Sequence, residues 1–202
     1  MAWKKFNWKI RNACRASNLS EGRGSKPVVA SVEERQRNVR RLASDILAKV
    51  DTRKAYADIL LDQALKNATL NERDRALLTE LTYGALRWRG NIDAQLSRYL
   101  RQPLAKTDPL IRNLLRVSVY QLRFLDKIPD YAAVNEAVEL ARNHSGGKSA
   151  GFVNAVLRNF LRDKDRIIGL APKDESVAGL AVTYSHPEWL VKRWIDEFGA
   201  EA

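Results

Sequence analysis

The chain has 202 residues, 45% of them hydrophobic, with a formal net charge of +11 and a sequence pI near 9.9. This length allows one good domain with tails or two small domains, and the positive charge points to a polyanionic partner. The single cysteine excludes an internal disulfide, and no apolar run of about 18 residues indicates a membrane span. Because the start also lacks the apolar segment of a secretory signal, a soluble cytoplasmic protein is expected.

Residues 1–30 carry more than half of the net charge, with seven basic side chains against one acidic side chain. Trp3, Phe6 and Trp8 stand among the basic residues, a Ser/Gly-rich run follows, and no helical stripe persists. The composition predicts a basic, disordered arm, whose aromatic and basic side chains could contact RNA. The alternative is a leader sequence or an over-long start, with no function of its own.

From residue 31 onward apolar residues recur with helical spacing, and no segment alternates convincingly as a strand. The chain is therefore expected to form an all-α bundle. The first predicted helix begins near Ser31, the second runs from about Ala55 to Asn67 with Ile59 on its core side, and the third is capped by Asn71 and interrupted or ended near Gly90. The next two are the stretches 91–100 and 108–125. Of the last three, one is capped by Asp130, one is opened by the 144–149 loop, and one is the stretch 186–199.

The stretch 108–125 is predicted to be the buried central helix. Asp108 can cap it, Pro109 suits its first position, and its apolar residues cover most of the circumference. Arg112, Arg116 and Arg123 fall within about 40° of one another on the helical wheel. Two interpretations stay open: the arginines pair with acids on neighbouring helices or bury their stems, or their guanidinium groups face phosphate.

Other basic residues also allow two interpretations. Arg37 and Arg41 lie roughly opposite the apolar stripe of the first helix, with Arg40 at the edge of the stripe, as solvated surface arginines would. Arg87 and Arg89 flank Trp88, which suits a nucleic-acid surface or plain packing.

The Gly147-Lys148-Ser149 triplet is not a nucleoside-triphosphate loop. Position 142, where that motif needs a glycine, is Arg142, and the loop follows a helix instead of a strand. Amides at the following helix N-terminus, with Lys148 beside them, could hold one backbone phosphate. A simple turn is the alternative.

The sequence predicts no catalytic or metal site. His144 and His186 have no cysteine or acidic cluster at ligand spacing, and Cys14 has no histidine nearby to activate it. No glycine-rich strand–helix turn suits a dinucleotide or S-adenosylmethionine. In the C-terminal part the pattern weakens, with Pro172 and Gly179 as predicted breakers. A final helix with Leu190, Trp194 and Phe198 at spacing four then looks like the start of a further segment.

Two segments carry a resemblance to a known family: LRVSVYQLRFLDKIPDYAAVNEAVELAR at 115–142 and KSAGFVNAVLRNFLR at 148–162, with YGALRW at 83–88. They resemble the NusB-like RNA-binding fold, and in particular the N-terminal domain of bacterial 16S rRNA cytosine-C5 methyltransferases of the Sun/RsmB type. The resemblance implies three parts: the basic arm at 1–30, a NusB-like RNA-binding helical domain at 31–165, and a linker with the start of a further segment at 166–202.

The resemblance implies an RNA-binding accessory domain that binds 16S rRNA and helps to place the target base, without activity by itself. The family's catalytic half binds S-adenosylmethionine and uses two cysteines, and nothing in this sequence matches it, so no cofactor is expected here. One alternative is a transcription antitermination factor of the NusB type, which binds leader RNA with a ribosomal protein. Another is a pure protein-interaction bundle whose charge serves only solubility.

The resemblance also bears on single residues. NusB relatives use the arginine-rich start of the first helix on RNA, which corresponds loosely to Arg37, Arg40 and Arg41. The apolar members of Phe152-Val153-Asn154 are expected in the core, and Asn135 and Glu136 are expected to be structural polar groups. Together with the central helix and the loop, the RNA-binding candidates are Arg37, Arg40, Arg41, Arg112, Arg116, Arg123 and Lys148.

Overall fold

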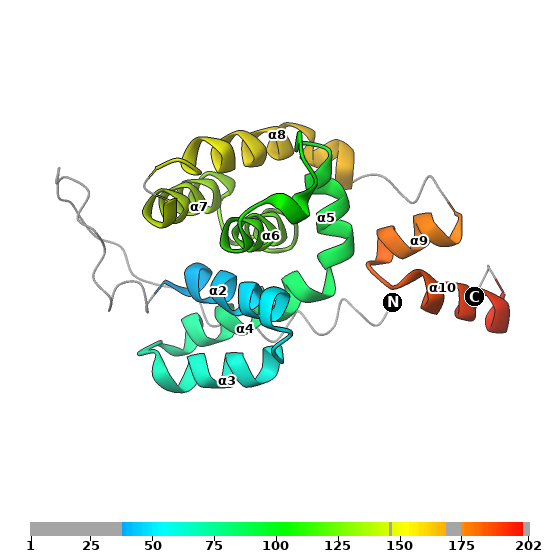
Figure 1. The fold of residues 1–202 in the computed structure, drawn as a ribbon, viewed down its shortest axis with the longest axis horizontal. Coiled ribbons are helices and arrows are strands. Elements are labelled where there is room, and N and C mark those ends of the chain that lie inside the picture. Colours follow the sequence, from blue (N-terminus) through cyan, green and yellow to red (C-terminus); the bar gives the residue numbers. More distant parts are fainter. Residues whose placement is uncertain (1–37, 146, 169–174, 200–202) are drawn as a thin grey trace.

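A computed structural model describes residues 38–145, 147–168 and 175–199, and all structural statements concern these ranges. The described chain is helical, without strands, which confirms the all-α prediction (Figure 1). None of its helices is long and apolar enough to cross a membrane. The helices are α2 (Val39–Arg53), α3 (Ala57–Asn67), α4 (Glu72–Arg87), α5 (Arg89–Ser97), the short 3-10 helix η2 (Leu104–Lys106), α6 (Pro109–Phe124), α7 (Asp130–Ser145), α8 (Ala150–Ile168), α9 (Val177–Tyr184) and α10 (Glu188–Phe198).

Helix α6 is the centre of the bundle, as predicted. In Figure 1 it lies between α2 on one side and α7 and α8 on the other, with α5 beside it. The Asp108 carboxylate accepts hydrogen bonds from the amides of Leu110 at 3.0 Å and Ile111 at 3.1 Å, and Pro109 opens the first turn. Between residues 110 and 122 every side chain except that of Arg112 is buried. Because burial of one large aliphatic side chain contributes about 1.5–3 kcal/mol, α6 organises the core.

The first described helix starts later than the sequence pattern suggests. Asn38 has extended backbone, with φ −79° and ψ 102°, and its side chain accepts from the Arg41 amide at 3.0 Å. Asn38 is therefore the N-cap, and α2 begins at Val39 instead of near Ser31. Ser31 itself, like the arm at 1–30, Cys14 and Arg37, lies outside the described residues.

Some local predictions are also corrected by packing. Ile59 is 53% exposed, and Leu61 supplies the buried contact of α3. The break predicted near Gly90 is present, and it lies at Trp88. Asp130 is the first residue of α7 instead of its cap, and its carboxylate pairs with the Lys164 ammonium at 2.9 Å.

The glycine of the 83–88 segment permits a close helix contact. A Cβ atom at Gly84 would overlap the ring of Tyr120 on α6. That ring is buried, and its hydroxyl donates a hydrogen bond to the Glu80 carboxylate. Burial, this hydrogen bond and the charge of Glu80 raise the pKa of Tyr120, against a smaller opposite effect of Arg87. Only glycine therefore fits at position 84 without displacement of the buried Tyr120 ring.

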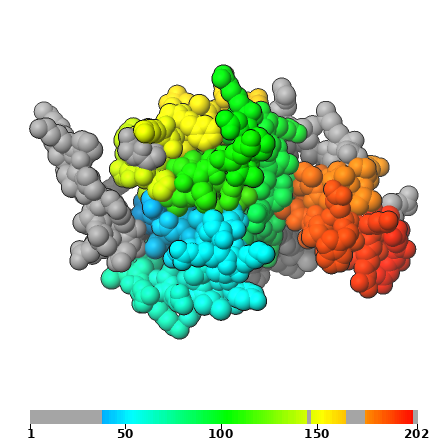
Figure 2. Space-filling view, in the orientation of Figure 1, coloured from blue at the N-terminus to red at the C-terminus, as the bar shows by residue number. Residues whose placement is uncertain are grey.

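The α9–α10 hairpin docks on the N-terminus of α5. The Ser185 hydroxyl, 95 residues away in sequence, accepts the Gly90 amide at 2.9 Å, and Asn91 Nδ2 donates to the carbonyls of Val182 at 3.2 Å and Thr183 at 3.1 Å. Ser185 thus caps α5, whose N-cap residue Trp88 makes no side-chain cap bond. Gly179 lies within α9, so its predicted role as a breaker is wrong. Figure 2 shows the hairpin at one end of the molecule.

Candidate nucleic-acid interface

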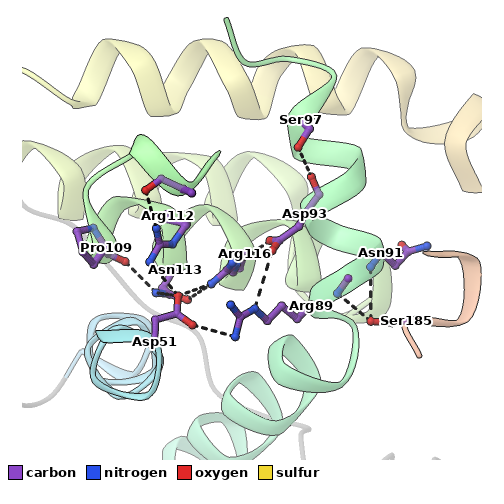
Figure 3. Close-up of polar contacts among 12 residues, drawn as sticks. Asp51, Arg89, Asn91, Asp93, Ser97, Pro109, Arg112, Asn113, Arg116 and Ser185 are labelled. Carbon is purple, nitrogen blue, oxygen red and sulfur yellow. Dashed lines mark hydrogen bonds and ion pairs between the residues drawn. The ribbon is translucent and has the colours of Figure 1, made fainter. Parts of the chain in front are cut away.

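Two of the three arginines on α6 belong to an ionic cluster inside the bundle, which we call the Asp51 cluster (Figure 3). Asp51, at the end of α2, is 4% exposed and accepts from Arg116 Nη1 at 2.6 Å and Arg112 Nη2 at 3.1 Å. Arg89 Nη1 reaches the other Asp51 oxygen at 3.0 Å. Arg116 also donates through Nε and Nη2 to the two oxygens of Asp93, each at 2.7 Å. The cluster joins α2, α5 and α6.

Charges and hydrogen bonds within the Asp51 cluster keep both Asp51 and Arg116 ionised. Burial opposes the ionised form of Asp51, but the charge of Arg116, hydrogen bonds from Asn113 and Arg116, and the charge of Arg89 together hold the pKa of this carboxyl below 3.8. Burial likewise opposes the charge of Arg116, yet hydrogen bonding and charge from Asp93 and Asp51 raise the Arg116 pKa. A buried guanidinium with two carboxylate partners has little capacity left for phosphate.

Arg123, the third arginine of the stripe, has no described carboxylate partner. It donates through Nη1 to the Asn91 side-chain oxygen, and its guanidinium carbon lies 4.9 Å from the ring centroid of Phe124 and 6.0 Å from that of Trp88. Burial lowers the pKa of Arg123. Cation–π contact and a neutral amide replace the salt bridge. The Arg87-Trp88-Arg89 segment is therefore divided: Trp88 packs on α6, and Arg89 joins the Asp51 cluster.

The arginines at the start of α2 are also engaged within the bundle. Arg40 donates to the Gln121 side-chain oxygen at 2.6 Å and pairs with Glu136 on α7 at 2.6 Å, and Glu136 also accepts from Asn38 at 3.1 Å. Glu136 is thus a structural polar group, as expected. Arg41 pairs with Asp45 one turn along at 3.0 Å. Arg40, Arg41, Arg112 and Arg116 as RNA ligands stay predictions, and their geometry favours the alternative of internal pairing.

The loop before α8 places the Lys148 side chain at the surface. Gly147 adopts φ +93°, in the region that glycine favours, and Lys148 is exposed at the helix start. Phe152 is 38% exposed, so the expectation that it packs in the core is wrong, whereas Val153 is fully buried. The wheel position explains the difference, because Phe152 lies about 90° from the centre of the buried side of α8.

The described residues contain no group of three or more His, Cys, Asp or Glu side chains placed to hold a metal ion. Nor do they contain a strand followed by a glycine-rich turn, the unit that holds nucleotide cofactors.

These features define a class: an all-helical bundle whose central helix is bound to its neighbours by arginine–carboxylate pairs and whose last core helix presents basic residues. The model of the NusB family matches residues 37–162. The chain belongs to the NusB family.

Two curated relatives and one solved structure give the range of similarity. The chain is 42% identical over 167 residues to the "Probable ribosomal RNA small subunit methyltransferase B" of Bacillus subtilis (strain 168), which covers 82% of this chain and 36% of that protein. It is 33% identical over 162 residues to the protein of the same description from Synechocystis sp. (strain ATCC 27184 / PCC 6803 / Kazusa), covering 80% and 36%. A crystal structure of T. maritima NusB is 28% identical with a TM-score of 0.56, covering 68% of this chain and 94% of that chain. The chain thus spans about a third of the length of these two methyltransferase-type relatives.

The sequence did not reveal the two carboxylates that pair with Arg112 and Arg116 of α6. Asp51 and Asp93 are 65 and 23 residues from Arg116, and no local spacing connects them. The exposure of Phe152, in contrast, could have been read from a helical wheel centred on the strongest apolar positions of α8, which are Val153, Val156, Leu157 and Phe160.

Proposed function

We propose that this chain is an RNA-binding domain that serves an rRNA cytosine-C5 methyltransferase and has no catalytic activity by itself. The observation that carries the proposal is the alignment: about four fifths of the chain matches relatives described as rRNA small subunit methyltransferase B, over only 36% of their length. The net charge of +11 supports a polyanionic partner, which in this proposal is 16S rRNA in the cytoplasm.

The proposal assigns the methyl-transfer chemistry to the part of such relatives that this chain does not match. S-adenosylmethionine would supply the methyl group there. The described residues do not fit this cofactor, because they form no strand–turn–helix unit that could cradle it. The role left to this domain is to bind the RNA backbone and limit the positions available to the target base.

A binding series with the full chain tests the proposal. A 16S rRNA fragment and an antiterminator leader RNA are titrated over a range of salt concentrations, and the logarithm of affinity is plotted against that of salt. We expect preference for the rRNA fragment, with a slope of several released ions, and no methyl transfer from labelled S-adenosylmethionine. No binding to either RNA would contradict the proposal and favour a protein-interaction bundle.

A second candidate function is supported by the T. maritima NusB structure, 94% of which is covered by this chain. In that case the chain is a transcription antitermination factor that binds leader RNA with a ribosomal protein. Preference for the leader RNA, increased sharply by addition of a ribosomal protein, would favour this function over the methyltransferase role.

The contribution of the first helix can be tested in the same series. If the start of α2 contributes to RNA binding, as the family resemblance predicts, Arg37→Ala combined with Arg41→Ala should weaken binding without unfolding the bundle, and each lost phosphate contact should lower the salt slope by about one unit. Unchanged affinity would remove this region from the RNA site, in agreement with the Arg41–Asp45 pair.

A further inference from the structure

Two basic segments without acids are brought together by the fold. Residues 140–162 contain no Asp or Glu, and neither do residues 94–107. The first segment comprises the end of α7, the loop and most of α8, and the second comprises the end of α5 and its connection to α6. In the Asp51 cluster arginines meet carboxylates, and at the end of α7 Arg142 pairs with Glu139. The part of the first segment from Lys148 onward and the second segment differ from these regions in their electrostatics.

Within the first segment, the exposed residues from Lys148 onward lie on one side of α8, which we call the α8 outer face. They are Lys148, Gly151, Phe152, Ala155, Arg158 and Arg162. With 100° per residue these positions span about a third of the helical circumference. Figure 2 shows α8 at the upper surface of the molecule. Three cations therefore point away from the core along about four turns of chain.

The two arginines of this face are oriented without being neutralised. Arg158 Nε donates to the Asn154 side-chain oxygen at 3.0 Å, and Arg162 Nη2 donates to that of Asn159. Both acceptors are neutral amides, and no ion pair joins Arg158 or Arg162 to a described carboxylate. A guanidinium held by an amide keeps its full charge and its remaining N–H donors for an anion.

The surroundings of these arginines suit a nucleic-acid strand. Gly151 and Ala155 are small and exposed, so a sugar–phosphate backbone can approach the helix closely between the charged side chains. The exposed ring of Phe152 offers a surface on which a base can stack, an interaction that tolerates any sequence. The amides of the α8 N-terminus add positive potential beside Lys148.

The second segment extends this face beyond α8. The Tyr99 hydroxyl donates to Asp163 at 3.0 Å, and the Tyr99 ring packs edge-on against Phe160 with centroids 6.4 Å apart. These contacts place the α5–α6 connection against α8, and the two lie side by side in Figure 2. Arg98 and Arg101, on either side of Tyr99 in sequence, are exposed.

We propose that the α8 outer face and the α5–α6 connection form one RNA-backbone site, in which Arg158, Arg162, Arg98 and Arg101 contact phosphates. This inference rests on the proposed RNA-binding function and deepens it by naming a surface on the opposite side of α6 from the start of α2. Arg158 and Arg162, about 6 Å apart along the helix axis, are the centre of the site.

The test compares two double variants of the full chain with the same loss of charge. Arg158→Gln with Arg162→Gln alters the proposed site. Lys49→Gln with Arg53→Gln, another exposed pair at four-residue spacing, alters α2 and is the control. A labelled mixed-sequence single-stranded RNA and a 16S rRNA fragment serve as probes between about 50 and 200 mM salt. The N-terminal arm is common to all proteins and cancels in the comparison.

We expect the α8 variant to bind both probes about tenfold more weakly, with a salt slope lower by about 1.4 to 2 units, and the α2 control to stay close to wild type. Arg158→Lys with Arg162→Lys should keep most of the slope, because charge is retained. Adding Arg98→Gln and Arg101→Gln to the α8 variant should lower the slope further.

The outcomes separate this site from the proposed function. If the wild-type chain binds RNA and the α8 variant binds with unchanged affinity and salt slope, the proposed site is overturned while the RNA-binding function stands. The α8 outer face would then suit an acidic protein partner. Equal losses in the α8 variant and the α2 control would also overturn it, because the effect would then be one of net charge. Failure of the wild type to bind either probe would overturn the function itself.

Discussion

Arginine side chains have opposite roles in the Asp51 cluster and on the α8 outer face. In the cluster, three arginines surround one buried aspartate, and Arg116 also reaches Asp93. On α8, Arg158 and Arg162 donate to asparagine oxygens and form no ion pair with a described carboxylate. The comparison teaches that a count of arginines does not locate a nucleic-acid site. The acceptor that each guanidinium finds in the folded chain decides whether its charge stabilises the bundle or remains available to a partner.

The largest expected effect comes from removal of the central acid. Asp51→Ala leaves Arg116 buried and short of one partner, and should lower the free energy of unfolding by about 3–5 kcal/mol, measured by urea denaturation. Asp62→Ala, in the exposed pair with Lys66, is the control and should cost less than about 1 kcal/mol. A similar small loss in both variants would mean that the cluster does not stabilise the bundle.

Acid should weaken the cluster in the wild-type chain. The pKa of Asp51 is lowered in the folded state, so its stabilising contribution is present above the unfolded value of about 3.9 and is lost as the pH falls through the lower folded value. Unfolding free energies measured between about pH 6 and pH 2 should therefore decline at the acid end. Asp51→Asn should decline less over the same interval, and parallel curves for the two proteins would remove Asp51 from the effect.

A smaller effect is expected where the α9–α10 hairpin meets α5, the helix that carries Asp93. Ser185→Ala removes the hydroxyl that accepts the Gly90 amide, and loss of such a cap costs about 0.5–2 kcal/mol. Amide hydrogen exchange at Gly90 should become faster. Ser97→Ala, which removes an exposed hydroxyl bonded to the Asp93 carbonyl, serves as a matched control and should change neither quantity appreciably.

The smallest effect on stability should come from the α8 outer face, although its proposed effect on RNA binding is the largest. Arg158→Gln with Arg162→Gln should change the free energy of unfolding by no more than about 0.5 kcal/mol, because both side chains are exposed and unpaired with acids. Arg116→Gln, the same substitution in the Asp51 cluster, should be strongly destabilising. Thermal denaturation of the two variants side by side would show whether the contrast between the regions holds.

Local signals predicted the elements well where one helix supplies its own cap and apolar stripe. A buried helix is predicted by the Asp108 cap, Pro109 and the apolar run of α6 without any information about its neighbours. The structure confirms this prediction. Predictions failed where neighbours decide. Phe152 lies at the exposed edge of its helical stripe, and Ile59 lies almost opposite the buried Leu61 side of α3. The start of α2 is fixed by its N-cap Asn38, which the apolar stripe does not identify.

By itself the sequence determined the helical class, the central position of α6, the family and the basic character, because these follow from periodicity, capping residues, motif order and net charge. Only the tertiary structure decided which arginines pair with carboxylates inside the bundle and which keep an unpaired charge at the surface. Asp51 and Asp93 reach Arg116 only after α2, α5 and α6 pack, and two acid-free segments become one surface only where Tyr99 meets Asp163. Electrostatic energy depends on distance in space, and distance along the chain does not reveal it.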